Sequence, residues 1–285
     1  MVTDFHLHTL VSDGELSPVE LLRHAAARGV RALSVTDHDT LGAYAWEQGA
    51  VFEEAERLGL TLTVGMEIDA DLDGLEVHLL GLDLDSGDEG LRAHVAAVRT
   101  ARVERARAEL PIVNGLLGAG SLTEADVLAP GRETVMRPHF IRPLLERGRF
   151  ASYREANAWF RANVESGVAV PKPSLEDAIA LVHAAGGAAV LAHPGYYQRA
   201  GLPVAERLAV LRGLGLDGVE LEYPYHSCSK DQFSVEEEAA FVAEIRAAGE
   251  ALGLRLTRGS DCHTAADFDR VYGPATAVGV PASDG

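Results

Sequence analysis

The amino-acid sequence predicts an α/β fold in which short strands alternate with longer helices around a parallel sheet or barrel. Two observations support this prediction: apolar runs of strand length recur along the chain, and the stretches between them carry helix-start signals. The chain has 285 residues, 47% of them hydrophobic, which is enough for the core of one large domain. We expect strands at 4–8, 31–36, 60–65, 76–81, 188–192, 218–222, 255–259 and 276–279.

The helices between these strands begin at capping sequences. Ser17-Pro18-Val19-Glu20 offers a capping serine, a proline at the first helical position and a glutamate that completes a capping box. Gly29 follows the helix that starts there, at a position typical of a helix end. Residues 234–237 repeat the capping pattern, and Ser174 with Asp177 gives a weaker version of it.

One long segment interrupts the alternation of strands and helices. From about Gly87 to Val170 the pattern is helical and contains no convincing strand. We therefore expect residues 87–170 to form a helical insertion that contributes to substrate binding, and residues 1–86 and 171–285 to form the barrel. The alternative is that these helices are ordinary peripheral helices of the barrel.

Charge and composition exclude several classes of partner. The formal net charge of -18 repels long polyanions, so we expect no long nucleic acid as partner, although bound cations could still attract a small anionic substrate. The two cysteines, Cys228 and Cys262, cannot build a disulfide framework, which favours a reducing compartment. The sequence contains neither an export signal nor a membrane span, so we expect a cytoplasmic protein of undetermined oligomeric state.

Ionisable residues follow the predicted strands again and again. Residues two apart on a strand share a face, so the two imidazoles of His6-Leu7-His8 can reach one ion. Because the carboxyl ends of parallel barrel strands converge on one rim, we expect the similarly placed residues to meet there. The other residues placed in this way are His38, Glu67, His78, His193, Asp261 and His263.

The chemistry of these side chains indicates a site for divalent metals. Imidazole mixed with carboxylate suits Zn, Mn or Fe, and the lack of thiolate ligands argues against a closed structural zinc site. We expect Cys262 to pack rather than to bind metal. Asp37 and Asp39 are candidates for orienting the imidazoles, and Asp39 could instead cap the following helix.

Four motifs resemble those of the PHP (polymerase and histidinol phosphatase) superfamily, and they occur in the same order along the chain. They are HLHTLVSDG at 6–14, TDHD at 36–39, AHP at 192–194 and SDCH at 260–263. The resemblance implies a distorted (β/α)7 barrel that binds two or three divalent ions. We expect manganese, with zinc, iron or magnesium as alternatives.

The resemblance also implies how nine residues share these ions, with Glu67 bridging the first two. The implied ligands are His6, His8, Glu67 and Asp261 for one ion, Glu67, His78 and His193 for a second, and Asp13, His38 and His263 for a third. Asp13 occupies a position that some relatives give to histidine, which makes the third site richer in oxygen.

Arg137-Pro138-His139 resembles the phosphate-binding element of PHP phosphatases. The guanidinium of Arg137 can hold two phosphate oxygens at once, and His139 could donate to phosphate or lie near the leaving group. The alternative is a surface ion pair for Arg137 and simple packing for His139. Lys172 is a weaker candidate for substrate contact.

The resemblance is strongest to the branch that includes nucleoside 3',5'-bisphosphate phosphatases. It implies a phosphoric monoester hydrolase that removes the 3'-phosphate from small nucleotides such as adenosine 3',5'-bisphosphate. A water shared by two cations would attack phosphorus directly, without a phosphorylated residue. Four alternatives stay open: a histidinol phosphate phosphatase, a 5'-3' exoribonuclease on short RNA, an amidohydrolase, and a metal-binding module without catalytic activity.

Overall fold

The computed structural model describes residues 1–227 and 233–274, and these form a seven-stranded sheet in chain order. The expected strand at 276–279 lies outside the described residues. Each of the other expected strands has a counterpart. The observed strands are β1 (Val2–Asp4), β2 (Val30–Val35), β3 (Thr61–Leu72), β4 (Leu75–Leu82), β5 (Ala188–Leu191), β6 (Gly218–Glu222) and β7 (Arg255–Arg258).

The sheet is mixed, so the expectation of parallel strands is wrong for β4. Strand β4 pairs antiparallel with both β3 and β5, whereas the remaining neighbours are parallel. The reason is the connection between β3 and β4, which consists of Asp73 and Gly74 alone, both with positive φ. Two residues suffice for a hairpin, while a parallel return needs a long crossover.

The two edges of the sheet meet and complete the distorted barrel. Beyond β1, Phe5 N donates to Arg258 O at 2.9 Å, and His8 N donates to Cys262 O at 3.1 Å. In return, Asp261 N donates to His6 O at 2.9 Å. These bonds bring the segment after β1 next to the segment after β7, although the two segments are separated by the whole length of the chain.

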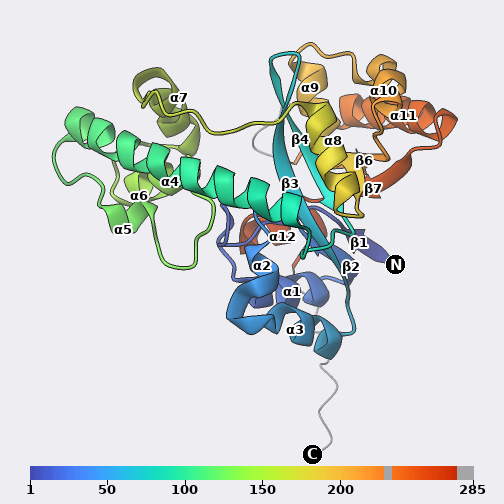
Figure 1. Ribbon diagram of the computed structural model, residues 1–285, viewed down its shortest axis with the longest axis horizontal. Coiled ribbons are helices and arrows are strands. Elements are labelled where there is room, and N and C mark those ends of the chain that lie inside the picture. Colours follow the sequence, from blue (N-terminus) through green and yellow to red (C-terminus); the bar gives the residue numbers. More distant parts are fainter. Residues whose placement is uncertain (228–232, 275–285) are drawn as a thin grey trace, which may run out of the picture.

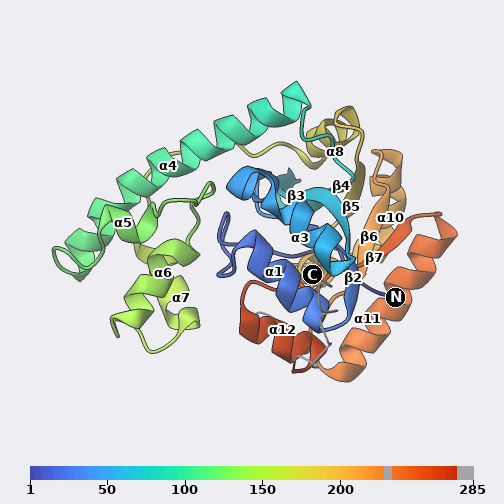
Figure 2. The ribbon, with the colours of Figure 1, turned by 90° about the horizontal axis from the view of Figure 1, so that it is seen from below.

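Helices cover the outside of this barrel (Figures 1 and 2). The predicted capping boxes are confirmed at Ser17 and Ser234, and Ser174 accepts a hydrogen bond from Asp177 N. The barrel helices are α1 (Pro18–Ala27), α2 (Gly42–Ala45), the 3-10 turn η1 (Trp46–Gln48), α3 (Ala50–Leu58), α8 (Leu175–Ala184), α9 (Pro194–Arg199), α10 (Val204–Gly213), α11 (Val235–Ala251) and α12 (Ala265–Tyr272).

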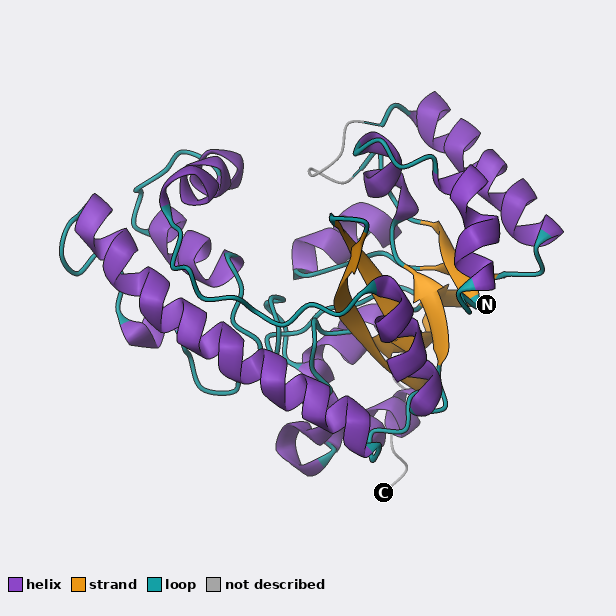
Figure 3. Cartoon of the chain, turned by 45° about the horizontal axis from the view of Figure 1, so that its top comes forward, coloured by secondary structure: helices purple, strands orange, loops and turns teal. Residues whose placement is uncertain are grey.

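Between β4 and α8 the described chain is helical, as Figure 3 shows. The long helix α4 (Glu89–Leu117) runs from the barrel to a group of three helices at its far end (Figures 1 and 2). These three are α5 (Glu124–Val127), α6 (Pro138–Glu146) and α7 (Tyr153–Asn163). They pack with the distal part of α4 around their own buried cluster, which includes Phe140 and Phe160.

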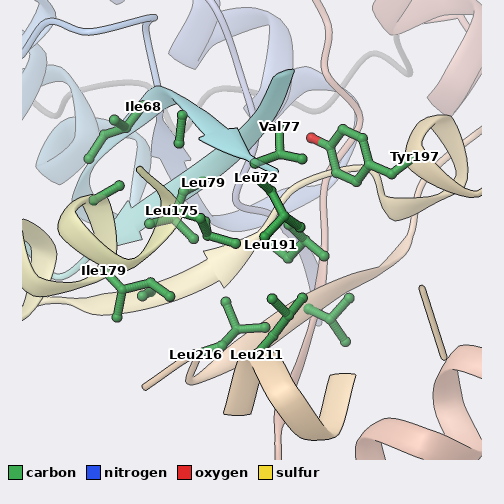
Figure 4. Packing of buried hydrophobic residues seen from close by; sticks show 14 of the residues in the cluster. Ile68, Leu72, Val77, Leu79, Leu175, Ile179, Leu191, Tyr197, Leu211 and Leu216 are labelled. Atoms are coloured by element: carbon green, nitrogen blue, oxygen red, sulfur yellow. The ribbon is translucent and has the colours of Figure 1, made fainter. Parts of the chain in front are cut away.

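The barrel has two larger apolar clusters. One joins β3, β4 and β5 to α8 and α10 through residues such as Ile68, Leu191 and Leu211 (Figure 4). The other packs α1, α3 and α12 against β2 and includes Leu33 and Phe268. Burying each such side chain contributes about 1.5–3 kcal/mol, which holds the strand ends in place. No helix in the described part of the chain is both long and apolar enough to cross a membrane.

We predict that the insertion unfolds separately from the barrel when its own core is weakened. Phe140→Ala removes a side chain that is 1% exposed and should cost about 3–5 kcal/mol. Hydrogen exchange followed by mass spectrometry should show protection lost over α5, α6 and α7 while the barrel strands keep theirs. Leu33→Ala, in the barrel core, should give the opposite pattern. Equal loss in both regions with Phe140→Ala would contradict a separate insertion.

Candidate metal centre

The carboxylate of Glu67 lies at the centre of the candidate site. It is 1% exposed and belongs to β3, which continues past the expected end at residue 65 and reaches Leu72. Its Oε1 lies 3.2 Å from His6 Nε2, 2.9 Å from His78 Nδ1 and 3.2 Å from His193 Nε2. Its Oε2 lies 3.3 Å from His8 Nε2 and 3.2 Å from His38 Nδ1. The structure therefore gathers five histidines around one carboxylate, and they come from four places: after β1, after β2, on β4 and after β5.

His6 and His8 approach Glu67 from the same side, as their spacing predicts. The strand β1 ends at Asp4, earlier than expected, but Leu7 still forms a parallel bridge with Cys262. Leu7 is fully buried in the cluster below α1, so the two imidazoles project to the opposite side.

The loop after His8 brings Asp13 to the site. Asp13 Oδ1 lies 3.2 Å from His263 Nε2 and 3.7 Å from His8 Nδ1. A β-carbon on Gly14 would lie 2.5 Å from the carbonyl oxygen of His8, so only glycine allows the loop to turn this tightly. The glycine that ends the first motif thus sets the position of the aspartate before it.

Two of the site residues adopt positive φ angles, which is uncommon for residues other than glycine. His193, directly after β5, has φ of 25°, and Asp261, after β7, has φ of 53°. Hydrogen bonds hold both in place: His193 N donates to Glu220 Oε2 at 2.6 Å, and Tyr223 Oη donates to Asp261 Oδ2 at 2.9 Å. Such backbone conformations cost free energy and persist where the surroundings impose them.

All nine residues that the sequence and the resemblance single out come together here. Their ligand atoms form four overlapping groups, each spaced closely enough to surround an ion. The groups are His8, Asp13, His38 and His263; His6, Glu67 and His193; His6, His8 and Asp261; and His38, Glu67 and His78. The groups differ in detail from the implied ligand sets, in which Glu67 alone is shared, because His6, His8, His38 and Glu67 each belong to two groups. The assignment of individual ligands to individual ions stays a prediction.

The buried carboxylates and imidazoles of the site shift one another's pKa. Burial raises the pKa of Glu67, but the imidazoles of His38, His6 and His78 outweigh burial and hold it well below its ordinary value. Burial lowers the pKa of His8, but Asp261 and Glu67 outweigh burial and raise it to about 10. Without metal, several imidazoles must therefore carry protons that compensate the carboxylates.

The donor set fits divalent metal ions. Among the described residues, several buried site atoms have no hydrogen-bond partner, namely His6 Nε2, both ring nitrogens of His8 and Glu67 Oε2. Buried polar atoms without partners are costly in a protein of this kind. Nitrogen and carboxylate oxygen atoms that converge without partners are what a divalent ion requires.

Glu220 is a site residue that the sequence analysis missed. It is fully buried on β6, its Oε1 lies 3.1 Å from His6 Nδ1, and its Oε2 accepts the bond from His193 N. Its carboxylate therefore orients one imidazole and one strained backbone at the same time. The available signal was a glutamate in the middle of an apolar strand.

Asp69 and Arg102 form a second support that the sequence analysis missed. Asp69 follows Glu67 by two residues on β3, and its Oδ1 lies 3.1 Å from His38 Nδ1. Arg102, on α4, donates to Asp69 Oδ2 at 2.8 Å and also to Asp39. The strand spacing could have indicated Asp69, whereas nothing distinguishes Arg102 from the other arginines of its helix.

The carboxylates of Asp37 and Asp39 do not contact the imidazoles of the four motifs. Asp37 accepts hydrogen bonds from Thr9 and Ser12 and so anchors the loop that carries Asp13. Asp39 pairs with Arg102 and accepts from Asp69 N. Cys262 is fully buried among apolar side chains, as expected.

The three expected substrate contacts lie in different surroundings. Arg137 precedes α6 and donates to Asn157 Oδ1 at 3.1 Å. His139 is 2% exposed, accepts from Met136 N through Nδ1, and lies near enough to Asp13 for that carboxylate to affect its pKa. Lys172 pairs with Glu76 on β4, two residues before His78.

Residues 4–132 match the family model described as PHP domain. The chain is 32% identical, over 95% of its length and 90% of the relative's, to a 3',5'-nucleoside bisphosphate phosphatase from Chromobacterium violaceum. It is 35% identical, over 69% of its length and 67% of the relative's, to the 5'-3' exoribonuclease Rnm of Escherichia coli.

A solved structure from Bifidobacterium adolescentis has the same fold. Its superposition gives a TM-score of 0.73 at 28% sequence identity, and it covers 92% of this chain and 87% of the other. That protein is described as a metal-dependent phosphoesterase.

We predict that Glu220→Gln weakens metal binding about tenfold to a hundredfold, because His6 loses the carboxylate that orients it. Glu222→Gln serves as matched control, since this residue lies on the same strand but is exposed and faces Arg246 and Arg258. Competition with a chromophoric chelator measures the dissociation constant. Equal affinity of the two variants would contradict the role of Glu220.

We also predict that metal binding releases protons and tightens as the pH rises from about 6 to 8. With its pKa raised to about 10, His8 is protonated in this range when no metal is bound, and a metal must displace that proton. Calorimetric titration in buffers of different ionisation enthalpy counts the protons released. Binding heats that do not depend on the buffer would show that the imidazoles are already neutral.

Proposed function

Because this chain belongs to the PHP family of phosphoesterases, we propose that it hydrolyses the 3'-phosphate of nucleoside 3',5'-bisphosphates such as adenosine 3',5'-bisphosphate. The observation that carries this proposal is the convergence of nine nitrogen- and oxygen-bearing side chains, Glu67 among them, in one site. The choice of substrate is supported by the similarity to a bisphosphate phosphatase over almost the whole chain. The products would be a nucleoside 5'-monophosphate and inorganic phosphate.

The proposed cofactors are two or three divalent ions held by His6, His8, Asp13, His38, Glu67, His78, His193, Asp261 and His263. We propose manganese as the native metal. When bound, such ions lower the pKa of a water molecule and offset negative charge on the phosphoryl oxygens. The filled set of ligands favours an enzyme over a metal-binding module without activity.

Other residues of the chain would orient the metal ligands. Glu220 and Asp69 orient His6 and His38 respectively, so the imidazoles need no rearrangement when ions and substrate arrive. Preorganised ligands of this kind reduce the free energy spent on reorganisation in the transition state.

His139 would act as a neutral donor of hydrogen bonds in this proposal. Burial, assisted by Arg132, lowers its pKa to about 3, so it stays neutral at physiological pH. Its Nδ1 accepts a backbone hydrogen bond, which leaves the proton on Nε2. Because His139 lies near Asp13, a proposed metal ligand, the proton on His139 Nε2 could be donated to the phosphate or to the leaving group. Lys172 and Arg137 complete the proposed substrate contacts.

A second candidate is 5'-3' exoribonuclease activity on short RNA, which the similarity to the Escherichia coli exoribonuclease favours. The reaction also breaks a phosphoester and could use the same ligands. The net charge of -18 favours small substrates over long RNA in either case. The low cysteine content fits a reducing compartment, and we propose the cytoplasm.

We expect adenosine 3',5'-bisphosphate to give the highest kcat/KM in a substrate panel with manganese, with inorganic phosphate and 5'-AMP as products. The panel should also contain histidinol phosphate, a short RNA with a 5'-phosphate, and an amide. Glu67→Gln keeps the size of the side chain but removes its negative charge, so this variant should abolish turnover. Loss of activity in the variant shows that the activity belongs to this protein and not to a contaminant. Preference for histidinol phosphate, or nucleotide release from RNA at a higher kcat/KM, would overturn the proposed substrate.

A further inference from the structure

A cluster of arginines lies in the helical insertion, beside the metal centre but outside it. The cluster consists of Arg105 on α4, Arg137 before α6 and Arg161 on α7, and we propose that it binds the phosphate group that is not hydrolysed. This inference rests on the proposed function, because a bisphosphate presents one phosphate to the metals and keeps the other. It assigns Arg137 to the retained phosphate rather than to the transferred one.

Arg137 has most of its hydrogen-bonding capacity available for a ligand. Its guanidinium carries five N–H donors, and among the described residues it makes one side-chain hydrogen bond, to Asn157 at 3.1 Å. No carboxylate in the described part of the chain lies within 4.0 Å of it. The side chain is nevertheless partly buried, and a partly buried guanidinium without a carboxylate partner is a suitable site for an anion.

The helix α7 turns one of its faces toward Arg137. Tyr153, Asn157 and Arg161 are spaced by four residues, so they follow one another along the same side of the helix. Asn157 on this face contacts Arg137 directly. Burial and the nearby charge of Arg161 lower the pKa of Arg137, so the two guanidinium groups repel each other. A phosphate between them would turn this repulsion into attraction.

The helix α4 connects Arg105 to a residue that supports the metal ligands. Arg102, three residues earlier on the same side of α4, donates to Asp69, which in turn contacts His38. Three residues of helix correspond to a rise of about 4.5 Å, so Arg105 lies one turn farther out than the residue that supports the metal ligands. Arg105 is also near enough to lower the pKa of Arg137. Arg105 is thus about one helical turn from Arg102, which supports the metal ligands through Asp69.

The local charges do not balance without a ligand. Among the described residues, Arg105 is the one member of the cluster with a carboxylate within 4.0 Å, namely Glu109, whose Oε1 lies 3.8 Å from Arg105 Nε. Glu76 is also nearby, but it is already paired with Lys172. The whole chain carries a formal charge of -18, so the excess of positive charge at the arginine cluster is opposite in sign to the charge of the protein as a whole. A phosphate dianion would compensate it and could accept two parallel bonds from each guanidinium.

The test compares two substrates that differ only in the retained phosphate, adenosine 3',5'-bisphosphate and adenosine 3'-monophosphate, with the full-length, manganese-loaded protein. In Arg161→Met and Arg105→Met the ratio of their kcat/KM values should fall about tenfold or more, since each variant loses charged hydrogen bonds to phosphate. Arg107→Met is the matched control, because this arginine lies on α4 but is 62% exposed and pairs with Glu124. Its ratio should equal that of the unmodified protein.

A second measurement separates this inference from the proposed function. Inhibition of aryl phosphate hydrolysis by 5'-AMP does not require that the bisphosphate is a substrate, and the inhibition constant should rise about tenfold or more in Arg161→Met. If the protein ignores the bisphosphate but shows this loss of inhibition, the proposed substrate is wrong and the phosphate site is supported. If both substrates are affected equally and inhibition by 5'-AMP is unchanged, the phosphate site is overturned.

Discussion

The burial of Glu67 among five imidazoles is the constraint on which the rest of this molecule depends. A carboxylate removed from water is tolerated only if positive charge compensates it, and here the compensation comes from histidines or from the ions that they can hold. These histidines lie on β4 or after β1, β2 and β5. The strands must therefore end within a narrow volume, and the apolar clusters between the strands and their covering helices provide the packing that keeps them there.

The antiparallel hairpin of β3 and β4 has a direct consequence for the chemistry. It brings Glu67, Asp69 and His78 to the site from a single, continuous two-stranded ribbon. A parallel strand would contribute mainly through the residues at its carboxyl end. Because β3 extends seven residues beyond the expected end, it can supply the bridging carboxylate and, two residues later, the carboxylate that supports His38.

The helical insertion is attached to the metal centre by charge as well as by the chain. Arg102 on α4 is 3% exposed and bonds to both Asp39 and Asp69, so the base of the long helix is fixed to the strands that carry the ligands. Removing one member of such a buried set would leave the others without compensation. The same helix then leads outward to Arg105. The support of His38 through Asp69 and the proposed phosphate contact of Arg105 are in this way placed on successive turns of one element.

The sequence by itself determined the strand and helix segments, the α/β class and eight of the nine residues that meet at the site, and the resemblance to the PHP family added Asp13. These features are local, because capping residues, apolar runs and side chains at strand ends are read from neighbours along the chain. The direction of β4 was also within reach, since Asp73-Gly74 is a typical hairpin turn. The supports Glu220 and Arg102 were decided by the tertiary structure alone. Their roles depend on which side chains, 33 to 214 residues away along the chain, lie within hydrogen-bond distance after folding. No periodicity in the sequence encodes that proximity.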